Sequence, residues 1–286
     1  MDNSLIYYLE GVSCKYKKAL NSALEIRKLS IKRGDIVFFV GASGVGKSTL
    51  LETLGLMNNT VVENPESKFY FFEKSPSEFT DLIDLWKKSE SALSHFRKNN
   101  LSFVFQTINM FNNLSAFENV CLARIIQNKS LDDSKLKARQ IMRKLFNEEA
   151  FDEIIEGKRV FELSGGQRQR LAFIRAAATD YNVLLADEPT GNLDAHNADK
   201  LMDELVGKVK MDNKTAVVVT HDIPLAMKYG NQVVLLTKNR VEENTIGGEI
   251  IPQNIFNRHQ NGWLNAKKNI WSSDEVLLRY LSNGLK

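Results

Sequence analysis

The chain has 286 residues, of which 43% are apolar, 38 are basic and 35 are acidic. This length and composition fit a globular protein with one large domain or two smaller ones. The net charge of +3 is too small, and the basic residues are too scattered, to predict binding to nucleic acid or to an anionic membrane surface.

The sequence also predicts a compartment. No apolar run approaches the roughly 20 residues that a membrane-spanning helix needs, and the N-terminus lacks the pattern of a signal peptide. Cys14 and Cys121 lie far apart without metal-ligand spacing, so we expect free, buried or half-buried thiols in a reducing environment. These features together predict a soluble cytoplasmic protein.

Short segments throughout the chain have the character of strands. SLIYYLEGVS (4–13) and ALEIRKLSI (23–31) alternate apolar and polar residues, which is typical of an antiparallel edge or a small side sheet. Later runs are almost wholly apolar and are separated by helical patterns, which indicates strands buried on both faces of a parallel sheet. These runs are DIVFFV (35–40), LSFVF (101–105), NVLLAD (182–187), AVVVT (216–220) and QVVLLT (232–237). The sequence therefore predicts a layered α/β core.

The stretches between these runs differ from each other. Within the weakly patterned residues 60–97 we expect a strand at FYFFEK (69–74) and a helix across FTDLIDLWKKSESALSHF (79–96). Residues 107–165 have helical periodicity, and Ser130 with the acids that follow it marks a helix start. We expect an inserted helical subdomain whose charged residues form a solvated face.

The C-terminal residues from 247 to 286 open with Gly247-Gly248 and end in SSDEVLLRYLSNG (272–284). The last segment has the capping serine and the acidic first turn of a helix. Two interpretations of Trp263 and Trp271 remain open, because these side chains either pack back on the core or dock a partner.

GASGVGKST (41–49) has the pattern of a phosphate-binding P-loop. It follows an apolar strand and precedes a helical segment, which is the context that this motif requires. Its glycines let the backbone N–H groups approach a β-phosphate, Lys47 supplies a charge to the β- and γ-phosphates, and the Ser48 hydroxyl is a ligand for Mg²⁺. The alternative is a plain glycine turn.

VLLADEP (183–189) supplies two acids at the end of a buried strand. Asp187 is expected to hold the magnesium water shell, and Glu188 to orient and polarise an attacking water. The alternative is a pair of surface acids after a strand.

A second anion-binding helix start follows at ELSGGQ (162–167), where Ser164 takes the N-cap position. Unpaired N–H groups and the positive end of the helix dipole make such a start suitable for phosphate.

These motifs together resemble the ATP-binding subunit of ATP-binding-cassette (ABC) transporters. The resemblance rests on Lys47, LSGGQ (163–167), ADEPTGNLD (186–194) and THD (220–222), and it covers about residues 4–245. Residues 106–120 and 187–199 are most similar to the lipoprotein-releasing, macrolide-exporting and cell-division ATPases. The resemblance implies a P-loop NTPase fold with a mostly parallel sheet, an N-terminal antiparallel β subdomain and an inserted α-helical subdomain.

The resemblance also assigns roles to individual residues. It implies catalytic roles for Glu188, for His221 at the γ-phosphate and for Lys47. Tyr16 would stack on adenine or, as the alternative, be a core residue, and His221 would otherwise be structural. The implied ATP-binding set is Tyr16, Gly41, Ser43, Gly44, Val45, Gly46, Lys47, Ser48, Thr49, Gln106, Ser164, Gly165, Gly166, Gln167 and Asp194, and the implied Mg²⁺ ligands are Ser48, Gln106 and Asp187.

Members of this family pair head to tail, so that the LSGGQ helix of one copy caps the ATP on the P-loop of the other. The resemblance therefore implies a homodimer and an integral-membrane permease subunit as partners, no nucleic acid, and a place on the cytoplasmic face of the inner membrane. We expect an ATPase domain at 1–246, with its helical subdomain at about 107–165, and a C-terminal extension of unknown role at 247–286. Asn112 stands where the subgroup usually has proline, and the extension matches no known pattern.

Two other functions remain to be distinguished from ATP-driven transport. In one, ATP cycling moves a membrane partner that controls an envelope enzyme without transport. In the other, which the single set of motifs and the low charge disfavour, a cassette acts on ribosomes or DNA.

Overall fold

The computed structural model divides into two compact units, which are described separately. The first unit consists of Met1–Arg97 and Thr215–Lys286, and the second of Lys98–Lys214. The structure describes residues 4–17, 19–73, 77–155, 157–241, 245–260, 262–266, 270–271 and 274–284.

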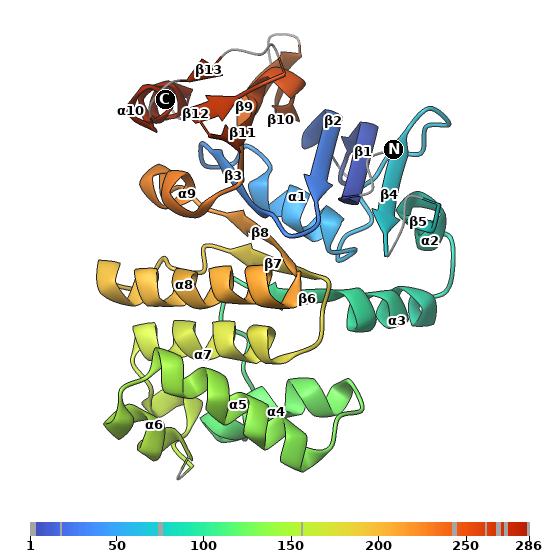
Figure 1. Cartoon of the computed structure of the whole chain (residues 1–286). Coiled ribbons are helices and arrows are strands. Elements are labelled where there is room, and N and C mark those ends of the chain that lie inside the picture. Colours follow the sequence, from blue (N-terminus) through green and yellow to red (C-terminus); the bar gives the residue numbers. More distant parts are fainter. Residues whose placement is uncertain are drawn as a thin grey trace. The chain divides into compact units, whose positions relative to one another are not determined.

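The first unit is built on one large sheet (Figure 1). Its strands run in the order β5-β4-β1-β2-β10-β9-β3-β8, and β11, β12 and β13 continue from the edge of β9. The strands are β1 (Leu5–Cys14), β2 (Leu24–Lys32), β3 (Ile36–Gly41), β4 (Lys68–Phe72), β5 (Phe79–Asp81), β8 (Thr215–Val219), β9 (Gln232–Val241), β10 (Thr245–Ile250), β11 (Ile255–His259), β12 (Gly262–Leu264) and β13 (Ile270–Trp271). The helical elements are α1 (Lys47–Leu54), α2 (Leu82–Trp86), α9 (Ile223–Tyr229), η2 (Pro252–Asn254) and α10 (Asp274–Gly284), and α3 (Glu90–Asn100) spans the boundary between the units at Arg97.

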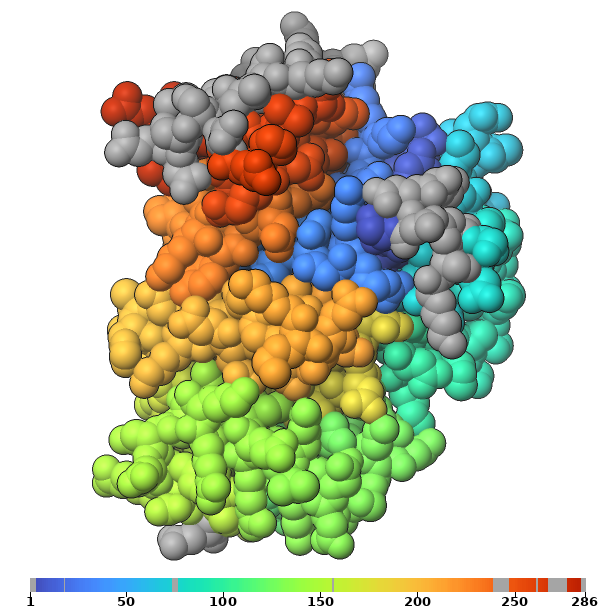
Figure 2. All heavy atoms as spheres, viewed as in Figure 1, coloured from blue at the N-terminus to red at the C-terminus, as the bar shows by residue number. Residues whose placement is uncertain are grey.

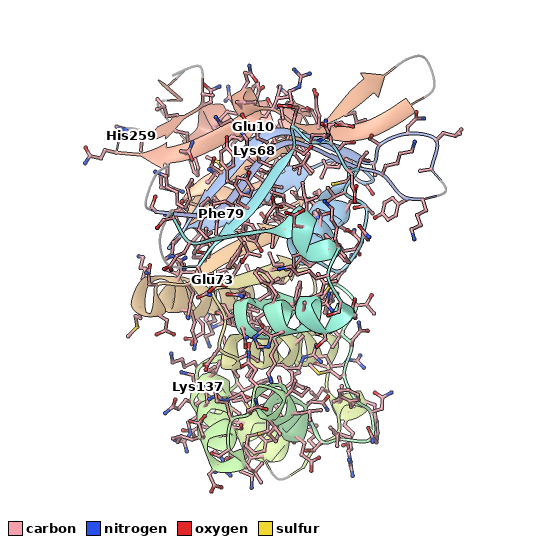
Figure 3. All side chains as sticks on the ribbon, turned by 90° about the vertical axis from the view of Figure 1, so that its right-hand side faces the viewer. Glu10, Lys68, Glu73, Phe79, Lys137 and His259 are labelled. Atoms are coloured by element: carbon pink, nitrogen blue, oxygen red, sulfur yellow. The ribbon has the colours of Figure 1, made fainter. Side chains whose placement is uncertain are left out.

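The N-terminal strands form the predicted antiparallel part of this sheet. β1 pairs antiparallel with β2 on one side and with β4 on the other. The alternating residues of β1 explain this arrangement, because one face is buried while the other carries Glu10. Glu10 and Lys68 of β4 form an ion pair at 2.9 Å on that outer face (Figure 3). Of the two predicted alternatives, the antiparallel edge is confirmed, because these strands belong to the large sheet and not to a separate one.

The parallel part of the sheet contains β3, whose six residues are all buried. β3 lies between β8 and β9 and is parallel to both. The apolar runs at 35–40, 216–220 and 232–237 are therefore strands covered on both faces, as predicted.

The single helix predicted across residues 79–96 is wrong. Phe79–Asp81 form β5, and two helices follow it, α2 and α3. The Asp81 carboxylate accepts hydrogen bonds from the backbone N–H groups of Ile83 and Asp84, and it thus starts the first helix after the strand. The Ser89 hydroxyl accepts from the N–H of Ala92 and begins the second. Both caps compete locally with a continuous helix. Phe79 packs on Tyr70 of β4 with ring centroids 4.6 Å apart.

The second unit contains the predicted helical insertion and a pair of parallel strands, β6 and β7. The helical periodicity predicted for 107–165 is present as several helices, and the Ser130 hydroxyl caps one of them, α5, as expected. α7 packs against α4, α5 and β6. The elements are β6 (Leu101–Val104), α4 (Ala116–Ile126), α5 (Leu131–Leu145), α6 (Glu148–Ile155), η1 (Val160–Glu162), α7 (Gly165–Ala178), β7 (Val183–Asp187) and α8 (Ala195–Asp212).

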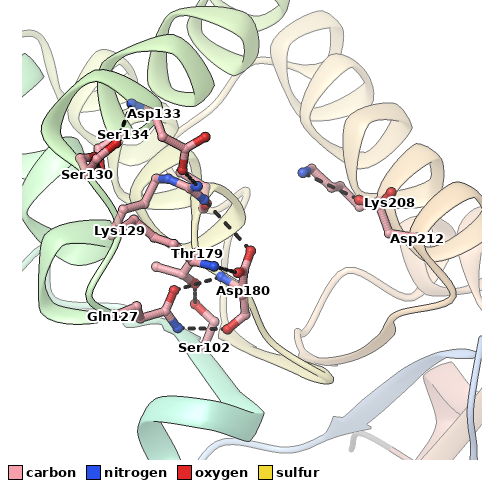
Figure 4. A network of polar contacts seen from close by, with 12 residues as sticks. Ser102, Gln127, Lys129, Ser130, Asp133, Ser134, Thr179, Asp180, Lys208 and Asp212 are labelled. Carbon is pink, nitrogen blue, oxygen red and sulfur yellow. Dashed lines mark hydrogen bonds and ion pairs between the residues drawn. The ribbon is translucent and has the colours of Figure 1, made fainter.

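One charge in this unit departs from the predicted solvated face. The side chain of Asp133 is half exposed, yet it pairs with the guanidinium of Arg124, of which only 5% is exposed. Asp180 extends the network, since it forms an ion pair with Lys129 at 2.6 Å and its backbone groups bond the Gln127 amide (Figure 4). These contacts tie the end of α4 to the turn before β7, so Asp133 has a structural role.

The C-terminal residues pack on the first unit. β10 spans the predicted boundary at 246 and pairs with β2 and β9. Trp263 is 1% exposed, so its interpretation as a packing residue is confirmed. The side chain of Trp271 and the capping serines 272–273 lie outside the described residues, whereas the predicted helix is present as α10.

Two further expectations can be compared with the structure. Both cysteines are free and buried, as expected, and burial raises the pKa of each thiol. Among the helices that the structure describes, none has the length and apolar character that would carry it across a bilayer.

Candidate functional site

The P-loop connects β3 to α1 in the first unit. Gly44 and Gly46 have φ values of 75° and 93°, a left-handed region that glycine adopts without the steric cost of a side chain. A Cβ on Gly41 would lie 2.9 Å from the carbonyl oxygen of Leu236. These glycines allow the loop to turn tightly into the N-terminus of α1.

Lys47 is the first residue of α1, and its side chain bends back over the loop. Its Nζ donates hydrogen bonds to the carbonyl oxygens of Gly41, at 2.8 Å, and of Ala42, at 2.9 Å. Ser43 and Ser48 are exposed beside it. The loop thus gathers a cation, a hydroxyl and the N–H groups of a helix start at one place, which is the chemistry of an anion site.

Tyr16 lies next to this loop. Its hydroxyl is 3.1 Å from the Thr49 hydroxyl in α1, and 42% of the residue is exposed. This exposure does not fit the alternative that Tyr16 is a core residue. A partly exposed aromatic face beside an anion site is a surface on which a planar base can stack.

His221 follows β8, which is the parallel neighbour of β3. The Thr220 hydroxyl accepts from the N–H of Asp222 at 3.0 Å, and the Asp222 carboxylate accepts from the N–H of Leu225 at 2.9 Å. These bonds fix the turn that leads into α9 and leave His221 exposed. Because parallel strands end at the same edge, His221 and the P-loop leave the sheet of the first unit on one side.

The remaining predicted residues lie in the second unit. Ser164 and Gln167 form a reciprocal cap at the start of α7: the Ser164 hydroxyl accepts from the Gln167 N–H at 3.2 Å, and the Gln167 side chain accepts from the Ser164 N–H at 2.9 Å. A Cβ on Gly166 would lie 3.3 Å from the carbonyl oxygen of Asn192. The signature helix, which is α7 with its LSGGQ start at 163–167, therefore begins against the loop that precedes α8.

Asp194 closes that loop as the N-cap of α8. Its carboxylate accepts from the N–H of Asn197 at 2.9 Å, and this bond is the main reason that the pKa of Asp194 is lowered. The structure thus gives Asp194 a local capping role in addition to the role predicted for it.

Gln106 and Asp187 follow the same ends of two paired strands. β6 and β7 are parallel, with Val104 opposite Ala186, so both residues leave the sheet at one edge of the second unit. Their side chains offer amide and carboxylate oxygens, which are the donors that Mg²⁺ prefers. Within the described residues, no group of three or more His, Cys, Asp or Glu side chains forms a metal-binding cluster.

Glu188, directly after β7, has a φ of 49°. This left-handed conformation is strained for a residue with a side chain, and such strain occurs often at functional sites. Two donors hold the Glu188 carbonyl oxygen at 3.1 Å: the side-chain amide of Gln169 and the N–H of Gly191.

Sequence analysis did not identify Gln169, whose side chain contacts the backbone of the candidate site residue Glu188. Gln169 lies in α7 and is 1% exposed, so an amide side chain there needs a partner. The only signal in the sequence is a polar residue on the apolar face of a helix, and that signal does not identify the backbone group of Glu188 as the partner.

The P-loop and the second capped helix start define a class of protein, namely a P-loop ATPase with two candidate phosphate sites. The sequence matches the model of the ABC transporter family across residues 24–191. The chain therefore belongs to the ABC transporter family, and it is an ATP-binding ATPase of that family.

Individual relatives agree with this assignment. The lipoprotein-releasing system ATP-binding protein LolD of Bordetella pertussis is 39% identical over 206 residues, which are 72% of this chain and 81% of the relative. The ABC transporter ATP-binding protein MJ0796 of Methanocaldococcus jannaschii is 34% identical over 239 residues, which are 82% of this chain and 94% of the relative.

Solved structures agree as well. The dimeric structure of the MJ0796 cassette aligns with a TM-score of 0.67 and 32% identity, covering 80% of this chain and 94% of that one. A second structure with the same scores is a dimeric post-hydrolysis state of MJ0796 bound to ADP and Pi. The predicted fold, an α/β P-loop NTPase with antiparallel N-terminal strands and an inserted helical region, is confirmed.

Proposed function

We propose that the chain hydrolyses ATP as part of a head-to-tail homodimer and thereby drives a separate membrane permease. The observation that carries this proposal is that one chain holds both a complete P-loop and a complete signature helix start. The dimers reported for MJ0796 support the same arrangement.

At the P-loop, Lys47 would exchange its hydrogen bonds with the Gly41 and Ala42 carbonyls for bonds with the β- and γ-phosphates. The N–H groups of the loop bind the β-phosphate, and the exposed ring of Tyr16 stacks on adenine. Ser48, Gln106 and Asp187 would hold Mg²⁺, which neutralises phosphate charge when bound. Glu188 polarises the attacking water and His221 contacts the γ-phosphate.

The signature helix of the second copy would complete the site. A Cβ on Gly165 would meet nothing within 4 Å among the described residues, so packing within the chain does not require glycine there. A close approach by the second copy would explain why a residue without a side chain stands at position 165. Residues 164–167 then present the positive end of α7 to the γ-phosphate.

A membrane partner is supported by two exposed aromatic residues in the second unit. Phe111 is 55% and Phe161 is 68% exposed. Arg159 joins the two segments that carry them, since its guanidinium donates to the Asn113 carbonyl oxygen at 2.7 Å. We propose that the permease binds this surface, which places the chain at the cytoplasmic face of the inner membrane. An ATPase domain at 1–246, with a helical subdomain at 107–165 and an extension at 247–286, is part of the same proposal.

ATP turnover by the purified chain tests the catalytic part. Lys47→Ala should abolish ATP binding, whereas Glu188→Gln should bind ATP and lose about 100-fold or more in kcat, as expected when a group that assists proton transfer is removed. Glu153→Gln is the matched control, because Glu153 is a surface residue paired with Lys158. Full turnover by Glu188→Gln would contradict the proposal. Substrate flux into vesicles that contain the permease then separates transport from control of an envelope enzyme.

A further inference from the structure

The C-terminal residues contact the short helix that follows His221. α9 has seven residues, and its C-terminal end meets β11. The Arg258 guanidinium donates to the carbonyl oxygen of Gly230 at 2.9 Å and to that of Met227, and the Arg258 N–H donates to the carbonyl oxygen of Asn231 at 2.8 Å. One residue of β11 therefore binds the carbonyl oxygens at the end of α9.

This contact stabilises the C-terminal end of α9. The last carbonyl groups of a helix have no partner within the helix and carry the negative end of its dipole. A guanidinium donates hydrogen bonds to these carbonyl groups, and its positive charge interacts favourably with the negative end of the dipole. A helix as short as α9 is not stable without tertiary contacts, so its position depends on its neighbours in the fold.

Arg258 is itself held in place by the C-terminal residues. Its guanidinium carbon lies 4.5 Å from the ring centroid of Trp263, which is opposite it in the β11–β12 pair. Arg258 is exposed on its outer side and covers the buried Trp263 ring. α10 also packs against α9, and Figure 2 shows the red atoms of the C-terminal residues directly above the orange atoms that precede them.

The other end of α9 begins at Ile223, two residues after His221. Asp222 caps the helix through the N–H of Leu225 at 2.9 Å. A shift of the C-terminal end of so short a helix is transmitted to this cap, because packed elements move as rigid bodies rather than deform continuously.

We propose that Arg258 is a positioning residue for ATP hydrolysis, which fixes α9 against Trp263 and thereby holds His221 in its productive place. This inference rests on the proposed role of His221. It gives the C-terminal extension a function in the catalytic cycle of the first unit, beyond covering the edge of the sheet.

Steady-state ATP hydrolysis by full-length variants tests the proposal. Arg258→Met removes two charge-assisted hydrogen bonds to carbonyl oxygens. It should lower kcat at least about tenfold and leave KM for ATP within about twofold of wild type. Arg258→Lys should retain part of the lost rate. Arg33→Met is the matched control, because Arg33 donates to the carbonyl oxygens of Phe72 and Glu73 at 2.7 Å, away from α9, and its kcat should equal that of wild type.

A double-mutant cycle separates positioning from general stability. In a His221→Ala background, Arg258→Met should cause no further loss of kcat, and amide hydrogen exchange in Ile223–Tyr229 should be faster in Arg258→Met than in wild type. A purely structural role predicts losses that add instead.

The outcomes are distinguishable. Wild-type kcat in Arg258→Met, or additive losses in the cycle, would overturn this inference while an inactive His221→Ala upholds the proposed function. A fully active His221→Ala would overturn both. If Arg258→Met does not fold, Arg258→Lys provides the test. A reduced kcat with faster amide exchange in α9 of Arg258→Lys would support the inference. A wild-type kcat with unchanged exchange would overturn it.

Discussion

Replacing Gly248 with Ala places a methyl group against the P-loop. The new Cβ would lie 1.8 Å from the carbonyl oxygen of Val45, whereas ordinary contact begins at 3.4 Å. Neither group is a flexible side chain, because Val45 contributes backbone and Gly248 is held in β10 by its N–H bond to the Ala23 carbonyl oxygen at 3.0 Å. Either β10 or the P-loop must move.

Both movements have measurable consequences. Overpacking of this kind costs about 1–3 kcal/mol of unfolding free energy, and a displacement of about 1 Å in a binding loop can cost 100-fold in activity. We expect Gly248→Ala to weaken ATP binding at least about tenfold, measured by titration with a fluorescent ATP analogue, and to lower Tm.

Gly207→Ala in α8 is the control, because a Cβ at Gly207 meets nothing within 4 Å among the described residues. It should raise the unfolding free energy by about 0.5–1 kcal/mol through helix propensity and leave ATP affinity unchanged. Wild-type affinity and wild-type stability in Gly248→Ala would refute the contact between β10 and the P-loop.

Three further predictions concern single side chains. Tyr16→Ala should weaken ATP binding about tenfold while inorganic triphosphate binds as before. Tyr16→Phe should bind ATP normally, because stacking needs the ring and not the hydroxyl. Equal losses of affinity for ATP and triphosphate in a calorimetric titration of Tyr16→Ala would exclude stacking. Burial raises the pKa of Asp35 to about 6, so the folded state binds the proton more tightly than the unfolded chain, and stability falls as pH rises from about 4 to 6. Asp35→Asn should flatten this dependence in thermal unfolding and, after allowance for partial exposure, stabilise the protein by about 1 kcal/mol above pH 7, whereas an unchanged pH profile would exclude the shift. Gln169→Leu removes the amide that holds the Glu188 carbonyl oxygen and should lower kcat about tenfold with little change in KM; an unaltered kcat would show that the bond does not position Glu188.

The sequence predicted the parts of the structure in which local chemistry and tertiary context agree. β3 is apolar throughout and leads into glycines whose left-handed φ values only that residue adopts easily, so the strand and loop are evident without coordinates. Ser130 and Ser164 likewise predict the starts of the helices that they cap.

Prediction failed where two local patterns compete. The stretch from 79 to 96 has apolar residues at helical spacing, but the Asp81 and Ser89 side chains bind nearby N–H groups and divide it into a strand and two helices. Asp132 and Asp133 look alike in the sequence, and only the buried Arg124 distinguishes the second.

The contacts of Gln169 and Arg258 could not be predicted for a different reason. Each binds a backbone carbonyl oxygen at least 19 residues away, and a backbone acceptor leaves no mark in the sequence. These residues complete the account of how Glu188 and α9 are positioned.

The central claim is that two copies of this chain enclose each ATP, and the mass of the Glu188→Gln variant in solution tests it most directly. With ATP and Mg²⁺, light scattering should give twice the 32.5 kDa of a single chain, and with ADP it should give the mass of the monomer. A strictly monomeric variant in saturating ATP, both alone and together with its membrane subunits, would contradict the claim.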